Sequence, residues 1–106
     1  MTAIELNLSF RQQEGITFQR LSIRLTAPDG LIEPQDLAGL TLPKGVQWTQ
    51  GIVLEGRAPI WLYGYLVHIC HAAAWVGCYD PRLGGAVVVE SHVKGMAVGR
   101  VLKVSL

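Results

Sequence analysis

The chain has 106 residues, of which 50% are hydrophobic and 16% charged, and its formal net charge is +1. This length is typical of one domain with its own hydrophobic core, which predicts a single unit over residues 1–106. So small a net charge excludes the strongly basic proteins that coat nucleic acid through many phosphate contacts, and no DNA partner is expected. Because few residues are charged, we expect another copy of the chain to cover part of the apolar surface.

The two cysteines and the first residues of the chain indicate the cellular compartment of the protein. Cys70 and Cys78 lie inside apolar runs without CxxC spacing, which is typical of buried thiols in a reducing environment. The first residues, MTAIELNLSF, contain no basic region followed by a cleavable apolar stretch. No apolar run approaches the ~18 residues of a membrane span. These features predict a cytoplasmic protein with no membrane partner.

The first two predicted elements form a hairpin. Residues 4–10 alternate apolar and polar side chains, the period of a half-buried strand, and RQQEG reads as the turn. Residues 16–25 form the second strand. The three-residue step from Phe18 to Leu21 breaks the alternation there and predicts a bulge.

The middle of the chain holds a short helix and then a crossover. Residues 27–48 are rich in proline turns and leave room for one short helix starting at Pro34. A buried strand over 51–56 precedes a helix over 59–72, because proline is tolerated at the first helical position. A strand over 75–79 follows the helix.

Two more strands complete the expected sheet, over residues 86–91 and in the C-terminal VLKVSL. A strand-helix-strand crossover between Ile52 and Tyr79 implies a parallel pair, because only parallel strands need such a connection. The fold class is therefore α/β, a single small domain with a mixed sheet.

The loops that follow the parallel strands are the first candidates for a site. Ligands bind beyond the carboxyl ends of such strands, where helix N-termini offer free N–H groups. In GRAP, Gly56 permits a close backbone approach, Arg57 can meet an anion, and Pro59 begins the helix. The second loop is YDPRLGG, which supplies Asp80 and Arg82. One cleft holding these groups suits a phosphodiester, although a plain turn with an Asp80–Arg82 ion pair is the simpler alternative.

The histidines add to this picture. His68 and His71 are spaced i, i+3 and share a helix face that Gly64 leaves open. Without two further ligands such a pair makes no metal site, so a structural role stays open. Asp80 and His92 are expected nearby in this topology, which raises the alternative of a metal site.

Aromatic residues of the predicted helix fall into two groups. One helical stripe reads as core packing and consists of Trp61, Leu62, Tyr65, Leu66 and Ile69. Tyr63 lies off this stripe, so we expect it to stack on a base or to pack against a second subunit.

The segment from Gly56 to His92 resembles the CRISPR-associated Csx-three family, the small ring nucleases of type III CRISPR systems. The shared pattern is a strand ending in GRxPIWL, a helix carrying HxxH, then YDPRLG and a strand ending in SH. The resemblance implies a CRISPR-associated Rossmann-like fold and a homodimer that can stack into tetramers around a cyclic oligoadenylate, usually cyclic tetra-adenylate. It also implies manganese as a cofactor. The resemblance implies a small polar residue directly before GR, whereas this chain has Glu55 at that position.

The family's residues carry over onto matching positions. His71 and Asp80 would be needed for cleavage, with Arg82 contacting a phosphate, and Asp80 and His92 are the implied metal candidates. Residues implied at the ligand are Gly56, Arg57, Pro59, His68 and Arg82. Because a two-fold dimer presents each loop twice, one modest set of cations per chain becomes a multi-point clamp. Catalytic and binding residues can also come from different subunits.

Three functions stay open at this point. The first is a ring nuclease that linearises cyclic tetra-adenylate and so switches off type III CRISPR signalling, with His71 as base or as a metal ligand. The second is a non-catalytic sensor or sponge for the ring. The third is a manganese-dependent 3′ deadenylase acting on short adenylate RNA.

Overall fold

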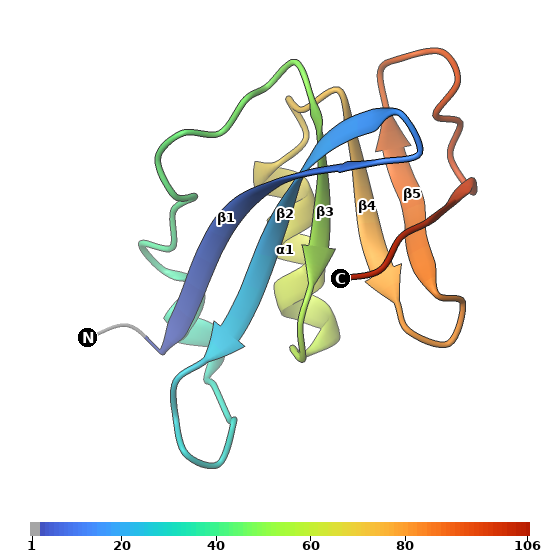
Figure 1. The fold of residues 1–106 in the computed structure, drawn as a ribbon. Coiled ribbons are helices and arrows are strands. Elements are labelled where there is room, and N and C mark those ends of the chain that lie inside the picture. Colours follow the sequence, from blue (N-terminus) through green and yellow to red (C-terminus); the bar gives the residue numbers. More distant parts are fainter. Residues whose placement is uncertain (1–2) are drawn as a thin grey trace.

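Six strands form one mixed sheet in the computed structural model, which describes residues 3–106 (Figure 1). The strands follow one another across the sheet in chain order, and only the β2-β3 and β3-β4 pairs are parallel. The elements are β1 (Ile4–Gln13), β2 (Ile16–Leu25), the 3₁₀ helix η1 (Pro34–Leu37), β3 (Gly51–Glu55), α1 (Ile60–Ile69), β4 (Trp75–Asp80), β5 (Gly85–Ser91) and β6 (Val101–Lys103). The predicted α/β class, the mixed sheet and the crossover are confirmed.

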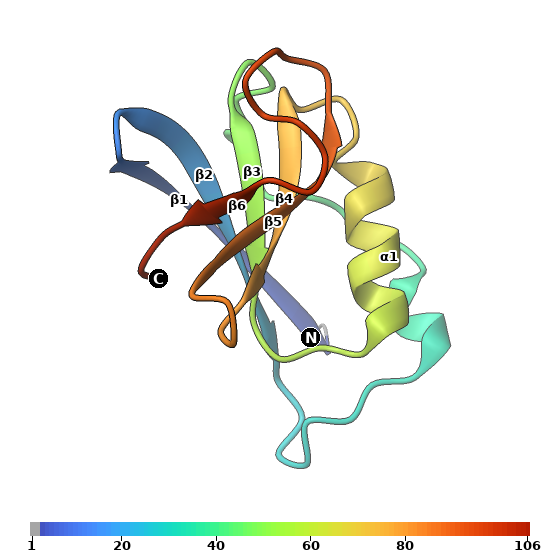
Figure 2. The ribbon, with the colours of Figure 1, turned by 90° about the vertical axis from the view of Figure 1, so that its right-hand side faces the viewer.

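Helix α1 connects the parallel strands β3 and β4 and lies against one face of the sheet (Figure 2). It is shorter than predicted at both ends. Pro59 has an extended backbone, with ψ of 155°, so it caps the helix instead of belonging to it. At the other end the His71 N–H bonds to the His68 carbonyl, an i to i−3 contact that tightens and ends the helix. His71 therefore lies just beyond α1.

The predicted bulge at Gln19 and Arg20 is wrong. β1 and β2 pair without interruption from Ile4 opposite Leu25 to Gln13 opposite Ile16. Instead, Phe18 and Leu21 point to opposite faces of β2, because each belongs to a different core. The step in the sequence marks the switch between the two cores. A register shift does occur elsewhere, where β4 meets β5 at Val76 and Gly77.

The first core lies under α1 and the second lies on the other face of the sheet. The residues of the first core include Ile23, Ile52, Leu54, Leu62 and Leu66, and those of the second include Phe18, Val53, Trp75, Val88 and Leu102. The sheet curls around the second core, so that the C-terminal segment after β6 reaches β1. There Arg11 and Gln13 each donate a side-chain hydrogen bond to the Ser105 carbonyl at 3.0 Å.

The turn between β1 and β2 is tighter than RQQEG suggests. The strand continues through Gln13, and Glu14 and Gly15 alone make the turn, with φ of 54° and 75°. Two consecutive positive φ angles are what a two-residue hairpin loop needs to match the twist of its strands.

Both cysteines are free thiols, as the sequence predicts. Cys70 and Cys78 are unpaired cysteines within the first core region, and burial raises the pKa of Cys70 to about 12. Burial also raises the pKa of Cys78. Across residues 3–106, no helix is both long enough and apolar enough to cross a membrane.

Gln19 is the one buried polar side chain of the described core, and its amide forms hydrogen bonds with the backbone of the segment that leads into β3. Its Nε2 donates to the carbonyls of Gln47, at 2.8 Å, and Gly51, at 3.3 Å, and its Oε1 accepts from the Gln47 N–H. We expect Gln19→Ala to lower the free energy of unfolding by about 2–4 kcal/mol, because it leaves a cavity and unpaired backbone groups. Urea unfolding measures this loss. The exposed Gln35→Ala is the control, and equal midpoints for both variants would contradict the assignment.

Candidate functional site

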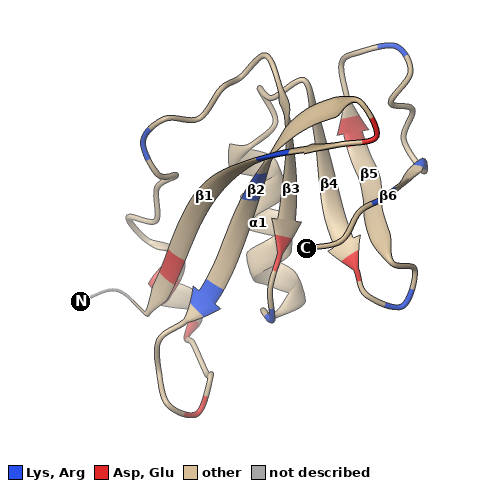
Figure 3. Cartoon of the chain, in the orientation of Figure 1, with Lys and Arg blue, Asp and Glu red and all other residues tan. Residues whose placement is uncertain are grey.

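The carboxyl ends of β2, β3 and β4 lie at one end of the sheet, because these three strands are parallel neighbours (Figure 1). The loops 26–33, 56–59 and 81–84 leave the sheet there. Figure 3 shows both positively and negatively charged segments at this end. Arg24 and Asp80 lie at the ends of β2 and β4, and Arg57 and Arg82 follow β3 and β4 by two residues.

Gly56 is required by the protein's own packing. Its φ is +128°, and a side chain there would collide with the carbonyl oxygen of Ile23 in β2. The close backbone approach expected of this glycine is thus an approach to the neighbouring strand.

Tyr63 fixes the same turn from the helix. Its hydroxyl donates to the Gly56 carbonyl at 2.7 Å, and its ring packs against the first core. Burial and the neighbouring Cys78 and Glu55 raise the pKa of Tyr63 to about 12. The ring therefore supports the GRAP turn from within the chain.

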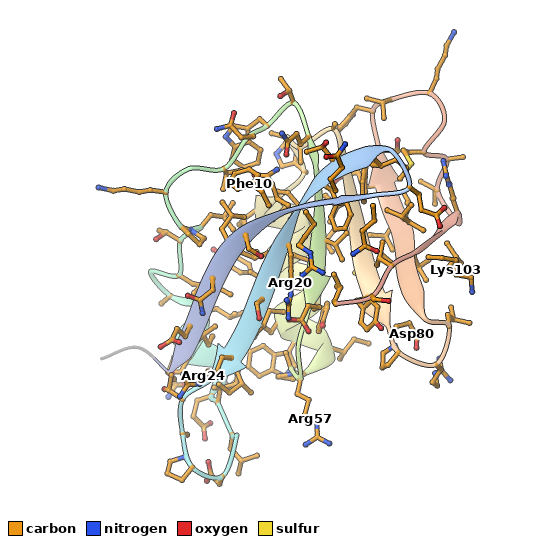
Figure 4. The ribbon with its side chains drawn as sticks, viewed as in Figure 1. Phe10, Arg20, Arg24, Arg57, Asp80 and Lys103 are labelled. Carbon is orange, nitrogen blue, oxygen red and sulfur yellow. The ribbon has the colours of Figure 1, made fainter. Side chains whose placement is uncertain are left out.

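Arg57 extends from the GRAP turn into open space beyond β3 (Figure 4). No hydrogen bond or ion pair joins its side chain to any other residue of the described range 3–106. It lines a pocket of about 460 Å³ together with Arg24, Asp29 and Gly30. An unpaired guanidinium beside an open pocket is available to an anionic ligand.

Arg24 is a candidate that sequence reasoning missed. It is the penultimate residue of β2 and lines the same pocket as Arg57. Its only described ion pair is a 3.4 Å contact with Glu5, and 71% of its side chain is exposed. No local sequence pattern pointed to Arg24. It lies near Arg57 only because β2 pairs with β3, and 25 residues separate these two strands in the sequence.

Asp80 and Arg82 form an ion pair across their turn. Arg82 donates from its backbone N–H to Asp80 Oδ1 at 2.9 Å and from Nη2 to Oδ2 at 3.0 Å. These hydrogen bonds hold the pKa of Asp80 below its usual value and raise that of Arg82. The side chain of Arg82 is 86% exposed, so its remaining N–H groups face solvent.

The histidines lie at the opposite end of the sheet. His68 is in the last turn of α1, His71 lies just beyond it, and His92 follows β5. The rings of His68 and His71 stack with centroids 6.0 Å apart. His92 Nε2 lies 2.8 Å from the His71 carbonyl oxygen, and because a carbonyl only accepts, this nitrogen is the donor. His92 therefore holds the backbone of His71 in place.

A pocket of about 490 Å³ opens beside these histidines, lined by Gly64, Val67, His68, His71, Val89 and Glu90. Glu90 Oε1 is buried and has no hydrogen-bond partner among residues 3–106. A buried carboxylate oxygen without a partner is costly, so Glu90 is a second functional candidate that sequence reasoning missed. Its signal was a lone acid in the apolar strand AVVVES.

One chain does not bring all the predicted residues together. Asp80 ends β4 and pairs with Gly85, whereas His92 follows the other end of the β4-β5 pair. A strand of six residues is about 17–20 Å long. His71 and His92 are therefore separated from Asp80 by the length of the sheet.

The same separation bears on the expected manganese. Within residues 3–106, no group of three or more histidine, cysteine, aspartate or glutamate side chains is arranged to hold a metal ion. Both oxygens of Asp80 are bound to Arg82, and His92 is at the far end. The residues of a single chain therefore do not fit a manganese site made by Asp80 and His92.

Glu55, which departs from the family pattern, is neutralised inside the chain. Arg20 donates to its Oε1 from Nη2 at 2.8 Å and from Nε at 3.1 Å, and Ser22 Oγ donates at 2.8 Å. Its register partner is Ser22, on the sheet face away from α1. This carboxylate therefore does not oppose a phosphate at the GRAP turn.

A family model described as CRISPR-associated protein (Cas_csx3) matches residues 25–103, which is most of the chain. The chain belongs to this Cas_csx3 family. A protein of Aquifex aeolicus (strain VF5), described as uncharacterized, is 49% identical to it over 73 residues, which cover 66% of this chain and 66% of that protein. The Cas_csx3 match includes all three carboxyl-end loops and all three histidines. Its span supports a CRISPR-associated function for this chain.

Proposed function

We propose that this protein is a ring nuclease that binds cyclic tetra-adenylate between subunits and linearises it. The observation that carries the proposal is the division of the site, with Arg57, Asp80 and Arg82 at one end of the sheet and His71 at the other. Membership of the Cas_csx3 family supports a place in CRISPR defence. Type III signalling by cyclic oligoadenylate is the process that such an activity would switch off.

The division implies that a complete site needs two copies of the chain. His71 of one copy would meet Asp80 and Arg82 of another, since no motion of side chains alone spans the length of β4. Activity would then depend on assembly, as expected for a homodimer that stacks into tetramers.

Binding rests on cations that are available to a ligand. Arg57 has no described partner and Arg82 is largely exposed, and Arg24 adds a third guanidinium at the same end. The repeated phosphates of the ring would meet these groups once per subunit, which supplies affinity without a strongly basic composition.

His71 would act as the general base. A ring nitrogen takes the proton of a 2′-hydroxyl, the 2′-oxygen attacks the adjacent phosphorus, and the bond from phosphorus to the 5′-oxygen breaks. The released 5′-oxygen takes up a proton, which leaves a linear product with a 2′,3′-cyclic phosphate and a 5′-hydroxyl. Arginine side chains stabilise the charge that develops on the phosphate oxygens. His92 positions His71 through the carbonyl hydrogen bond.

In this proposal manganese is only a component of the assay, to be added or left out. When bound, such an ion would supply Lewis-acid stabilisation of the phosphate. Because the residues of one chain do not fit it, no step of the mechanism is assigned to it.

The test is to incubate the purified protein with cyclic tetra-adenylate, with and without manganese, and to separate the products by chromatography. We expect linear products with a cyclic phosphate end. Intact ring bound in stoichiometric amount would contradict the nuclease proposal and favour the sensor or sponge. Cleavage of adenylate-tailed RNA with an intact ring would favour the deadenylase.

A further inference from the structure

The pocket of about 490 Å³ beside the histidines lies between one side of α1 and β5. Four of its residues are spaced i, i+3, i+4 and i+7 on the helix and just beyond its end, so they share one side: Gly64, Val67, His68 and His71. Strand β5 contributes Val89 and Glu90. The pocket therefore combines apolar, imidazole and carboxylate groups.

A β-bulge turns Glu90 toward this pocket. Ala86 and Val88 point into the second core, and strict alternation along β5 would send Glu90 to the same face. The register shifts before that point, so Val89 has no partner on β4 and Glu90 lies opposite Val76. Val76 belongs to the first core, under α1, and residues directly opposite each other share a face. The bulge thus places an acid on the face that α1 covers, and bulges often re-aim a side chain at a functional site.

Gly64 has no explanation in the packing of the chain itself. It lies inside α1, where glycine is less favourable than any residue except proline. A side chain at this position would meet no atom of residues 3–106 within 4 Å, whereas a side chain at Gly56 would collide with the backbone of Ile23. A helix glycine beside empty space suits a group from outside the chain that approaches the helix closely.

Glu90 presents a hydrogen-bond acceptor that no donor of the described chain uses. Across residues 3–106, its side chain takes part in no hydrogen bond or ion pair. Its Oε1 is hidden from solvent, while the side chain lines the pocket, so a bound molecule would reach this carboxylate through the pocket. A partly desolvated acceptor forms stronger hydrogen bonds than one in bulk water, and leaving it unpaired is costly.

These groups distinguish among the parts of a cyclic oligoadenylate. A carboxylate repels the phosphates and only accepts hydrogen bonds, so the group that it meets is an uncharged donor. Val67 and Val89 offer apolar contact to a flat ring, and the His68 imidazole can stack on one. The adenine base has such a ring and carries an exocyclic N6 amine that donates hydrogen bonds. The base therefore fits this pocket better than the phosphate does.

We propose that the pocket binds an adenine base of the ring and that Glu90 accepts a hydrogen bond from its N6 amine, so that Glu90 selects adenine. This inference rests on the proposed function, which supplies the ligand. It also links binding to cleavage. The base and the 2′-hydroxyl of a nucleotide are attached to adjacent carbons of the ribose, so a base held in this pocket brings its own 2′-hydroxyl to His71.

The test compares two cyclic tetranucleotides by calorimetric titration, both built with 2′-deoxyribose so that neither can be cleaved by its own 2′-oxygen. One carries adenine and the other carries unsubstituted purine, which lacks only the N6 amine. The wild type is expected to bind the adenine ring at least ~10-fold more tightly. Glu90→Val should bind both rings equally. Glu90→Gln should keep a preference for adenine, because its amide oxygen still accepts from N6.

Urea unfolding of the same variants shows whether the fold is intact. Glu90→Val should unfold at the same urea concentration as the wild type or at a higher one, because it removes a buried oxygen that has no described partner. Glu14→Gln is the matched control, since it removes an exposed carboxylate from the turn between β1 and β2. It should discriminate between the two rings as the wild type does.

The outcomes separate this inference from the proposed function. Equal affinity of the wild type for the two deoxy rings would overturn the role of Glu90, and so would a Glu90→Val variant that still prefers adenine. Binding of cyclic tetra-adenylate without binding of its deoxy counterpart would mean that a ribose hydroxyl carries the recognition, which overturns the inference and leaves the proposed function standing. A wild type that binds none of the rings would contradict both.

Discussion

His71→Ala is expected to slow linearisation of cyclic tetra-adenylate by ~10²–10⁴-fold, the usual contribution of a positioned general base. Affinity for the ring should change little, because the phosphate-binding arginines lie at the other end of the sheet. Single-turnover cleavage followed by chromatography gives the rate, and calorimetric titration gives the affinity. Cleavage at the wild-type rate would remove His71 from the mechanism.

Two variants of His92 separate a positioning role from metal binding. His92→Gln keeps an N–H donor that can reach the His71 carbonyl, so it should retain most of the rate, whereas His92→Ala should lose part of it. If His92 were a metal ligand, both variants would lose activity and manganese dependence together. Equal losses in both would therefore contradict the positioning role.

Arg57→Ala is expected to weaken binding of cyclic tetra-adenylate by ~10-fold or more, since a charge-assisted hydrogen bond to a phosphate is lost in each subunit. The rate at saturating ring should stay near the wild-type value. Because phosphate contacts release counterions, the variant should also show a shallower dependence of affinity on salt. Calorimetric titration at two salt concentrations measures both effects.

Lys94→Ala is the matched control for this experiment, because it removes an exposed cation from a loop distant from the GRAP turn. Its affinity should equal that of the wild type. If Arg57→Ala bound the ring as tightly as the control but cleaved it slowly, Arg57 would belong to catalysis and the assignment would be wrong.

Local sequence patterns predicted most of the fold. Alternation located β1 and β2, and the proline before the helix together with flanking apolar runs located β3, α1 and β4. The parallel contact between β2 and β3 left no local signal, because the 25 residues between them have no regular period. Without that contact, the sequence does not show that β2 is buried on both faces, and the step from Phe18 to Leu21 predicts a bulge.

The sequence predicted both parts of the candidate site, the carboxyl-end loops and the histidines, but it placed them in one cleft, whereas they lie at opposite ends of the sheet. Turn chemistry identified GRAP and the Asp80–Arg82 loop, and both lie where a parallel unit places them. The histidines were expected in the same cleft, yet a ten-residue helix is about 15 Å long, so residues after its end cannot meet the loop before its start. Arg24 and Glu90 were not predicted as site residues, because only the folded chain places Arg24 in the pocket of Arg57 and buries Glu90 Oε1 without a described hydrogen-bond partner.

The account depends most on the claim that cleavage needs residues from two copies of the chain, and mixing inactive variants tests it directly. His71→Ala and Asp80→Ala should each be inactive alone. Mixed in equal amounts, they should recover about a quarter of the wild-type rate, since random assembly joins an intact His71 to an intact Asp80 in that fraction of sites. A mixture that stays as inactive as its components would show that each chain holds a complete site, and would contradict the account.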